Sequence, residues 1–182
     1  MFKKLSGILI SLFLAYFSFP NQLVQLDFLA WFCFVPLLLV IEQEGRGRKL
    51  FLLWSFFLVL LLALLWLDPF KFPEGLANKG AGLGLLSLYL VYPLGYSCLL
   101  TLYKRPLIAA SAWIAFEYLL TVLPLGFPLS FAVTQYKAHL LLPICSITGI
   151  YGLSFLLIFT NCTLANFIRN RNKQELILPA IL

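Results

Sequence analysis

Long apolar runs separated by short polar connections dominate the chain. Each run is close to the roughly 20 residues that an α-helix needs to cross a bilayer, and most charged residues fall in the connections. The pattern predicts an all-α fold, a polytopic transmembrane helical bundle of about six spans. The predicted spans cover approximately residues 5–19, 23–41, 50–67, 81–103, 106–123 and 140–168.

The first run admits two interpretations. A basic start, Met1-Phe2-Lys3-Lys4, before an apolar stretch is typical of a signal peptide. However, no small-residue cleavage pattern follows, and the chain turns at Pro20 directly into the next apolar run. We therefore favour a retained first span that pairs with the second as a helical hairpin.

Prolines mark irregular places in two of the runs and in one connection between runs. Pro36 interrupts the second span, and Pro93 predicts a kink in the fourth. Residues 124–128 contain two prolines and a glycine and cannot continue a regular helix. We expect irregular or re-entrant chain from there to His139.

The last seven residues, 176–182, begin another apolar run that is too short to span a bilayer. They are either a short interfacial tail or the start of a seventh span that is truncated here, and we favour the second interpretation. The expected organisation is a transmembrane domain over residues 1–168, followed by a basic segment and the start of that span over 169–182.

Composition excludes a water-soluble fold, because 62% of the residues are hydrophobic and only 11% are charged. If each run crosses the membrane, ten of the 13 basic residues fall on one side and three on the other. The positive-inside rule then places both termini in the cytoplasm. The net charge of +6 reflects this topology, and we expect no nucleic-acid partner.

The residue types leave little room for catalysis. The chain has one histidine and four cysteines, and the cysteines all lie in apolar runs, where a thiolate is disfavoured. No metal-binding cluster and no phosphate-binding glycine motif is present. We therefore predict no catalytic residue, no metal and no cofactor within this chain.

Glu117 is the exception, because it lies near the middle of the fifth predicted span. An ionised carboxylate there costs at least a few kcal/mol, so it must be neutral, paired or facing water. It could contact a lipid headgroup, or it could link the helix to a Tyr, Ser or Thr on a neighbour. We favour the structural link. The tryptophans could similarly line a lipid-binding groove, although interfacial belts and packing explain most of them.

Several short motifs follow one another in a recognisable order. They are Phe17-Ser18-Phe19-Pro20, residues 26–32, residues 35–38, Trp113 with Glu117, Gly126-Phe127-Pro128, Gln135, and residues 149–155 with Asn161. This series resembles the membrane half of the bacterial apolipoprotein N-acyltransferases. The resemblance covers residues 5–168.

The resemblance implies an inner-membrane enzyme that moves an acyl chain from a phospholipid to the N-terminal amine of a diacylglyceryl lipoprotein. In that family a nitrilase-like domain carries the Glu-Lys-Cys triad, and no residue of this chain matches it. The resemblance therefore implies a chain that is inactive alone and works with a nitrilase-like region, either continuous with it or a separate chain. Candidate residues for the lipid or substrate portal are Glu117, Gly126, Phe127, Pro128, Gln135 and Tyr151.

Two alternatives remain open at this level. One is a stand-alone, non-catalytic membrane protein that binds lipid or scaffolds other proteins. The other is a transporter, which is less favoured because a single mid-span carboxylate and no evident repeat offer little for a coupled substrate site.

Overall fold

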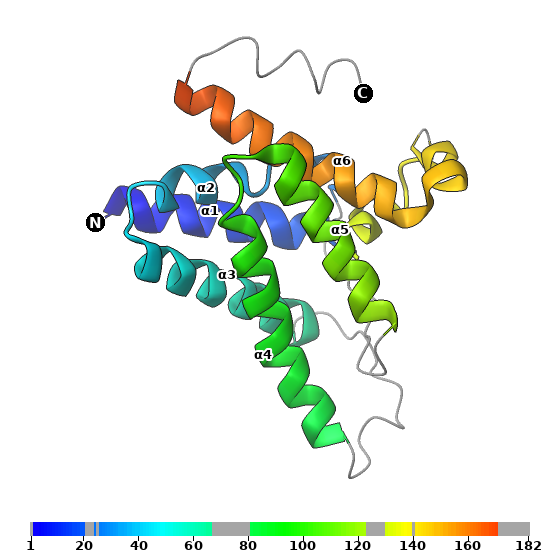
Figure 1. The fold of residues 1–182 in the computed structure, drawn as a ribbon, viewed down its shortest axis with the longest axis horizontal. Coiled ribbons are helices and arrows are strands. Elements are labelled where there is room, and N and C mark those ends of the chain that lie inside the picture. The colour runs from blue at the N-terminus through cyan, green and yellow to red at the C-terminus, as the bar shows by residue number, and fades with distance from the viewer. Residues whose placement is uncertain are drawn as a thin grey trace.

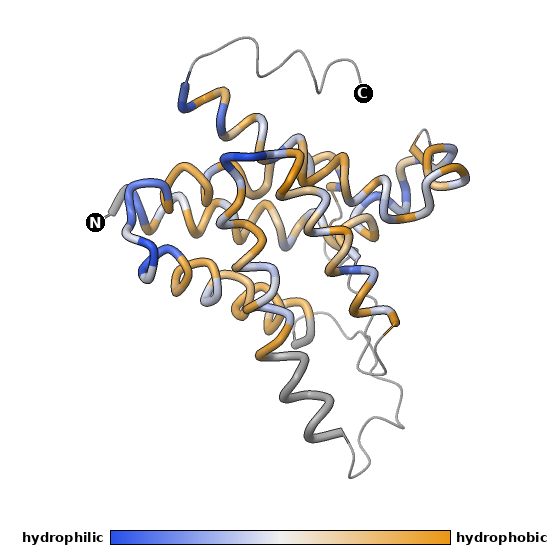
Figure 2. The backbone as a smooth tube through the Cα atoms, in the orientation of Figure 1, coloured by the Kyte–Doolittle hydropathy of each residue, from blue (hydrophilic) through white to orange (hydrophobic). Residues whose placement is uncertain are grey.

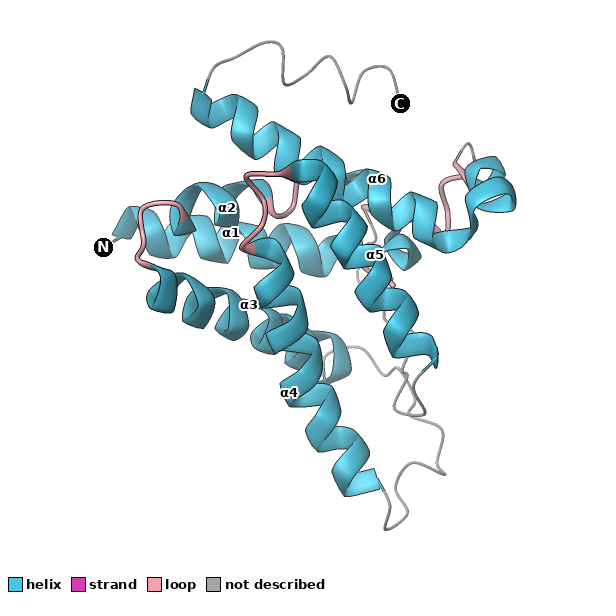
Figure 3. Ribbon diagram, viewed as in Figure 1, coloured by secondary structure: helices cyan, strands magenta, loops and turns pink. Residues whose placement is uncertain are grey.

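The structure, a computed structural model, describes residues 2–20, 24, 26–66, 81–122, 130–139 and 141–170. Every regular element in these ranges is a helix, which confirms the all-α fold class (Figures 1 and 3). The elements are α1 Phe2–Ser18, η1 Asp27–Trp31, α2 Val35–Ile41, α3 Arg46–Trp66, α4 Ala81–Leu100, α5 Pro106–Val122, η3 Phe131–Gln135 and α6 Leu142–Asn170, where η marks a 3-10 helix.

Helices that follow one another along the chain pack side by side. α1 packs against α2, α3 against α4, and α5 against α6, while α6 also contacts α2 and both 3-10 helices (Figure 1). Two segments, Arg46–Leu64 and Pro143–Asn170, are long and apolar enough to cross a membrane. α1 and α5, with 17 residues each, are shorter, so the count of six spans stays a prediction.

The second predicted span is not one continuous helix. It consists of η1, a turn over residues 32–34, and the two-turn helix α2. Pro36 lies in the first turn of α2, where a missing N–H leaves no hydrogen bond unmade. The proline therefore starts a helix here, whereas the sequence pattern predicted an interruption within one.

The sixth predicted span is also divided. Gly149, inside α6, has φ 68° and ψ −175°, a conformation that only glycine adopts readily. A short first segment of α6 ends there, and a longer helix runs on from residue 150 to Asn170 (Figure 1). Much of the short segment is accessible, with Ile147 87% exposed.

Phe34 lies at the centre of the core, in the turn before α2. Its ring centroid is 5.0 Å from that of Phe131 on η3 and 6.0 Å from that of Trp113 on α5. Two phenylalanines of α3, Phe56 and Phe57, complete the cluster at 6.1 and 5.8 Å. The irregular segments therefore supply core side chains as the long helices do.

The outer faces of the long helices are apolar as well. Leu5, Leu9 and Phe13 repeat at four-residue spacing along α1 and are each more than half exposed. Exposed leucine, valine and isoleucine side chains likewise occur on α4 and α5. A helical bundle that is apolar inside and outside suits a lipid environment better than water.

Hydrophilic residues gather at one end of the bundle (Figure 2). Glu44 pairs there with Lys4 of α1 and with Arg48 of α3. Glu42 pairs with Lys104, between α4 and α5, and with Arg169 near the end of α6. The ion pairs thus join four chain segments at the same end of the molecule.

Candidate functional site

Glu117 is the centre of a buried hydrogen-bond network on the inner face of α5. The side chain is 3% exposed, and its Oε1 accepts hydrogen bonds from the Trp113 indole N–H and from the backbone N–H of Phe131, both at 2.8 Å. Its Oε2 accepts a hydrogen bond from the Ser130 hydroxyl at 3.0 Å. Two of the three donors come from the start of η3, so the carboxylate anchors that short helix to α5.

Ser154 of α6 extends the network. Its hydroxyl lies 3.0 Å from that of Ser130 and accepts a hydrogen bond from the backbone N–H of Ala132 at 3.0 Å. The first two amides of η3 are thus satisfied by side chains of α5 and α6. This matters because a backbone N–H buried away from water is costly unless it is bonded.

Gln135 ends η3 and ties it to η1. Its side chain is 1% exposed, and its amide nitrogen donates to the Asp27 carbonyl at 2.7 Å. Its amide oxygen accepts from the Trp31 indole N–H at 3.3 Å. Gln135 therefore connects two irregular segments that lie more than 100 residues apart in the sequence.

Asn161 of α6 bonds in a similar way to backbone groups at the break between η1 and α2. Its Oδ1 accepts from the backbone N–H of Phe34 at 2.9 Å, and its Nδ2 donates to the Ala30 carbonyl at 2.7 Å. Ser11 of α1 accepts the N–H of Leu37 at 2.8 Å. Neighbouring helices thus satisfy the backbone that the break leaves unpaired.

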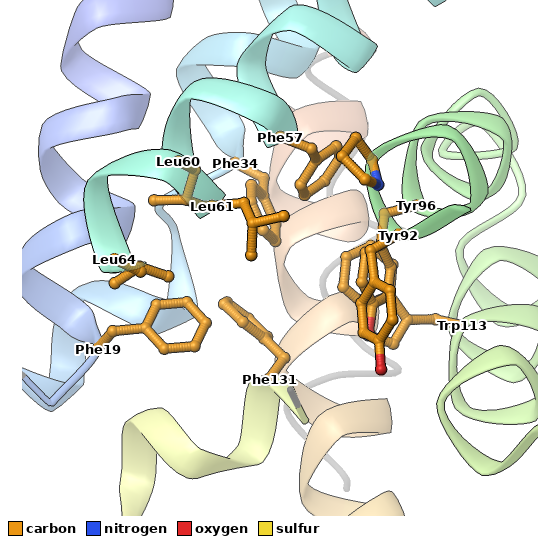
Figure 4. A pocket seen from close by; sticks show the side chains of 11 residues that line it. Phe19, Phe34, Phe57, Leu60, Leu61, Leu64, Tyr92, Tyr96, Trp113 and Phe131 are labelled. Carbon is orange, nitrogen blue, oxygen red and sulfur yellow. The ribbon is translucent and has the colours of Figure 1, made fainter. Parts of the chain in front are cut away.

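An apolar pocket lies beside this network (Figure 4). Phe131, whose backbone Glu117 holds, and Trp113, which donates to Glu117, both form part of its wall. The pocket is lined by Phe19, Phe34, Phe57, Leu60, Leu61, Leu64, Tyr92, Pro93, Tyr96, Trp113 and Phe131. The lining comes from α3, α4, α5 and η3, from the turn before α2, and from Phe19, which directly follows α1.

Comparison with known proteins gives the family. The profile of the apolipoprotein N-acyltransferase N-terminal domain matches residues 11–163, most of the chain. The chain belongs to this family. No solved structure matches it significantly.

Individual members of this family are similar to the chain over most of its length. An apolipoprotein N-acyltransferase of Geobacter metallireducens is 33% identical over 94% of the chain, and one of Thermotoga maritima is 31% identical over 95%. These alignments cover 34% and 38% of the respective relatives. The chain thus spans about a third of the length of the curated relatives that it matches.

The structure brings some of the predicted portal residues together and separates others. Glu117 and Gln135 hold the two ends of η3. Tyr151 lies apart from them, on α6, with its hydroxyl 3.1 Å from that of Thr121 and its ring against Tyr118. The predicted portal residues Gly126, Phe127 and Pro128 lie outside the described residues.

Sequence reasoning missed two serines that bond to backbone groups, Ser130 and Ser11. Ser130 was not singled out, although its position directly before a short helix is one that favours an N-cap, and its hydroxyl accepts from Ala132 N–H at 3.3 Å. Ser11 lies within an apolar helix and gave no signal in the sequence. Across the described ranges, no three His, Cys, Asp or Glu side chains form a group that could hold a metal ion.

Proposed function

We propose that this chain forms the membrane half of an N-acyltransferase that takes an acyl chain from a phospholipid and passes it to the N-terminal cysteine of a lipoprotein. Family membership and the names of the relatives support this reaction. We infer that this chain binds lipid and does not catalyse acyl transfer by itself. A nitrilase-like region, in the same or a separate polypeptide, carries out the bond-forming chemistry.

The observation that carries the proposal is the apolar pocket. Its lining is almost wholly aliphatic and aromatic, as is typical of the walls of small-molecule sites. Tyr92 and Tyr96 are the lining residues with a hydroxyl. Such a lining suits a hydrocarbon chain and offers little to a polar headgroup.

The polar network gives the pocket a defined wall. Glu117 and Ser154 fix the first residues of η3, which include Phe131. Gln135 fixes the other end of η3. In this proposal Glu117 and Gln135 act as positioning residues, and they do not react.

The proposed setting is the bacterial inner membrane, with about six spans and both termini in the cytoplasm. The end that carries the ion pairs then faces the cytoplasm, in keeping with its basic character. The opposite end, which includes residues 130–139, faces the periplasm. We propose that the entrance for phospholipid and lipoprotein acyl chains is near residues 130–135 and Tyr151.

A chimaera tests the proposal. The matching part of the Geobacter metallireducens relative is replaced by this chain, and acyl transfer from phospholipid to a diacylglyceryl lipopeptide is measured. Leu61 lines the pocket and is 6% exposed, whereas Leu62 is 37% exposed outside it. We expect Leu61→Trp to fill the pocket and lower kcat/KM at least about tenfold, equivalent to about 1.4 kcal/mol. Leu62→Trp is the matched control and should retain activity.

Three outcomes of this experiment are informative. Equal activity of the two tryptophan variants would exclude the pocket as the acyl site. A well-folded chimaera that binds phospholipid without transferring acyl chains would favour the stand-alone lipid-binding alternative. A monodisperse chimaera that neither binds nor transfers would contradict both functions.

A further inference from the structure

The end of the bundle that carries the ion pairs has more cations than its carboxylates can balance. The described residues there include seven basic side chains and two acidic ones, a surplus of five positive charges. Each of Glu42 and Glu44 already has two basic partners. The basic residues are Lys4, Arg46, Arg48, Lys49, Lys104, Arg105 and Arg169.

Two arginines among these basic residues are exposed to solvent. Arg46 begins α3 and Arg105 precedes α5, and both side chains are exposed. Within the described ranges neither forms an ion pair with a carboxylate. The two regions adjoin, because the Lys49 ammonium of α3 lies 5.6 Å from the centre of the Tyr103 ring in the turn before α5.

Exposed apolar side chains follow these cations closely in the sequence. Phe51, little more than one turn after Arg46, is 63% exposed. Leu107 and Ile108, which directly follow the turn with Arg105, are 57% and 47% exposed. A soluble anion would use the cations alone, whereas an amphiphile with an anionic head would also use the apolar surface beside them.

We propose that Arg46 and Arg105 bind the phosphate headgroups of anionic phospholipids, phosphatidylglycerol being the test case. The guanidinium groups donate hydrogen bonds to phosphate oxygens, and the acyl chains lie along Phe51 and Leu107. This surface is separate from the apolar pocket, which is lined by the second half of α3 and by Phe19, the residue that follows α1. The inference goes beyond acyl transfer and holds whether or not the chain supports that reaction.

The experiment measures lipid binding to the purified 182-residue chain in a neutral detergent. Native mass spectrometry gives the affinity for phosphatidylglycerol and for phosphatidylcholine. The test variant is the double substitution Arg46→Gln/Arg105→Gln. Lys137→Gln is the control, because it removes an exposed cation from the end of the bundle near η3.

We expect tighter binding of phosphatidylglycerol than of phosphatidylcholine. The double variant should lose roughly 30-fold in affinity for phosphatidylglycerol, from the typical contribution of two basic residues at an anionic surface. Arg105→Gln alone should lose more affinity than Lys137→Gln.

Other results would overturn the proposal. Equal affinity for the two lipids would exclude headgroup recognition, and equal behaviour of the double variant and Lys137→Gln would exclude the two arginines. If millimolar inorganic phosphate displaced the lipid, the site would be one for soluble anions. Both arginines are exposed and form no ion pair within the described part of the chain. A thermal melt without lipid should therefore be the same for all variants, and lost folding would contradict their assignment as free ligands.

Discussion

At the scale of single residues, the buried carboxylate of Glu117 is explained by its donors. Three groups donate to it, an indole N–H, a backbone N–H and a hydroxyl, and together they replace the water that the carboxylate loses on burial. Removal of the carboxylate would leave these donors buried and unpaired. A buried donor without a partner costs more than the hydrogen bond contributed when made.

The first prediction compares two substitutions of this residue. Glu117→Ala should lower the free energy of unfolding by about 2–4 kcal/mol, since it leaves several buried donors unsatisfied. Glu117→Gln should cost less, because its carbonyl oxygen can still accept from Phe131 and Trp113 and its amide can donate to Ser130. Denaturation of the protein in mixed micelles, followed by tryptophan fluorescence, measures the difference.

The neighbouring Tyr118 supplies the control. Its side chain is on an exposed face of the same helix, 59% accessible, and Tyr118→Phe should change stability by no more than about 0.5 kcal/mol. If Glu117→Ala were as mild as Tyr118→Phe, the network would not hold η3.

At the scale of elements, two glycines have different structural roles. Gly95 of α4 faces the Phe116 ring of α5, and a Cβ at that position would collide with the ring. Gly149 of α6 instead provides a backbone conformation, with φ 68°, that ends one helical segment and starts the next. Ser154 and Asn161 follow this kink, so the direction of the second segment decides whether their side chains reach η3 and η1.

The second prediction follows from the backbone at Gly149. Gly149→Ala should lower the free energy of unfolding by about 1–3 kcal/mol, because L-residues rarely adopt this conformation. Gly47→Ala, in the exposed first turn of α3 with open space around it, should be neutral or stabilise by up to about 1 kcal/mol. Unfolding of the two variants in mixed micelles measures the difference. Equal effects would show that the backbone at position 149 does not require glycine.

At the scale of the whole molecule, the ion pairs close one end of the bundle. Glu44 lies between α2 and α3, and its pairs reach the first turn of α1 and the first turn of α3. Glu42 reaches the α4–α5 turn and the end of α6. These two carboxylates connect segments that are up to 127 residues apart.

The third prediction concerns pH. The hydrogen bond from Lys4 holds the pKa of Glu44 below its usual value of 4.5. A carboxyl group whose pKa is lowered by folding stabilises the protein above its unfolded pKa, and this contribution disappears as the pH falls through the folded pKa. We therefore expect the Glu44 contribution to be present at pH 7 and to be lost below about pH 4.5.

Glu44→Gln isolates this contribution from those of other carboxyl groups. The variant should be less stable than the wild type at pH 7, and the difference should shrink as the pH falls below 4.5 or as salt is added. Thermal melts at pH 7 and pH 3.5, at low and high salt, measure it. A difference that stayed constant with pH would mean that the Lys4 pair does not contribute to stability.

Much of the helical content could be predicted from the chain alone. Apolar runs of span length are local features, and so are the polar connections that end them, which is why α1, α3, α4 and α5 match predicted runs. Glu117 also stood out, because an acidic residue is rare within an apolar run. The resemblance to the family depended on ordered motifs, and the family comparison confirmed it.

The breaks within the runs could not be predicted in detail. Pro36 was compatible with a kink inside a helix or with the first turn of a new one, and local sequence does not distinguish them. The glycine at 149 is equally ambiguous, since glycine is also common within membrane helices. Side chains that are distant in the sequence decide the outcome at Pro36, because Asn161 and Ser11 satisfy the backbone around that break.

The sequence by itself determined the fold class, the apolar character of the surface and the family, because composition and run length do not depend on which helices meet. Only the tertiary structure decided the partners of Glu117, the pairing of Gln135 with η1, and the pocket beside Phe131. Each of these joins segments that are far apart in the chain. Hydrogen bonds and van der Waals contacts act over a few ångströms, so such partners are selected only when the helices pack.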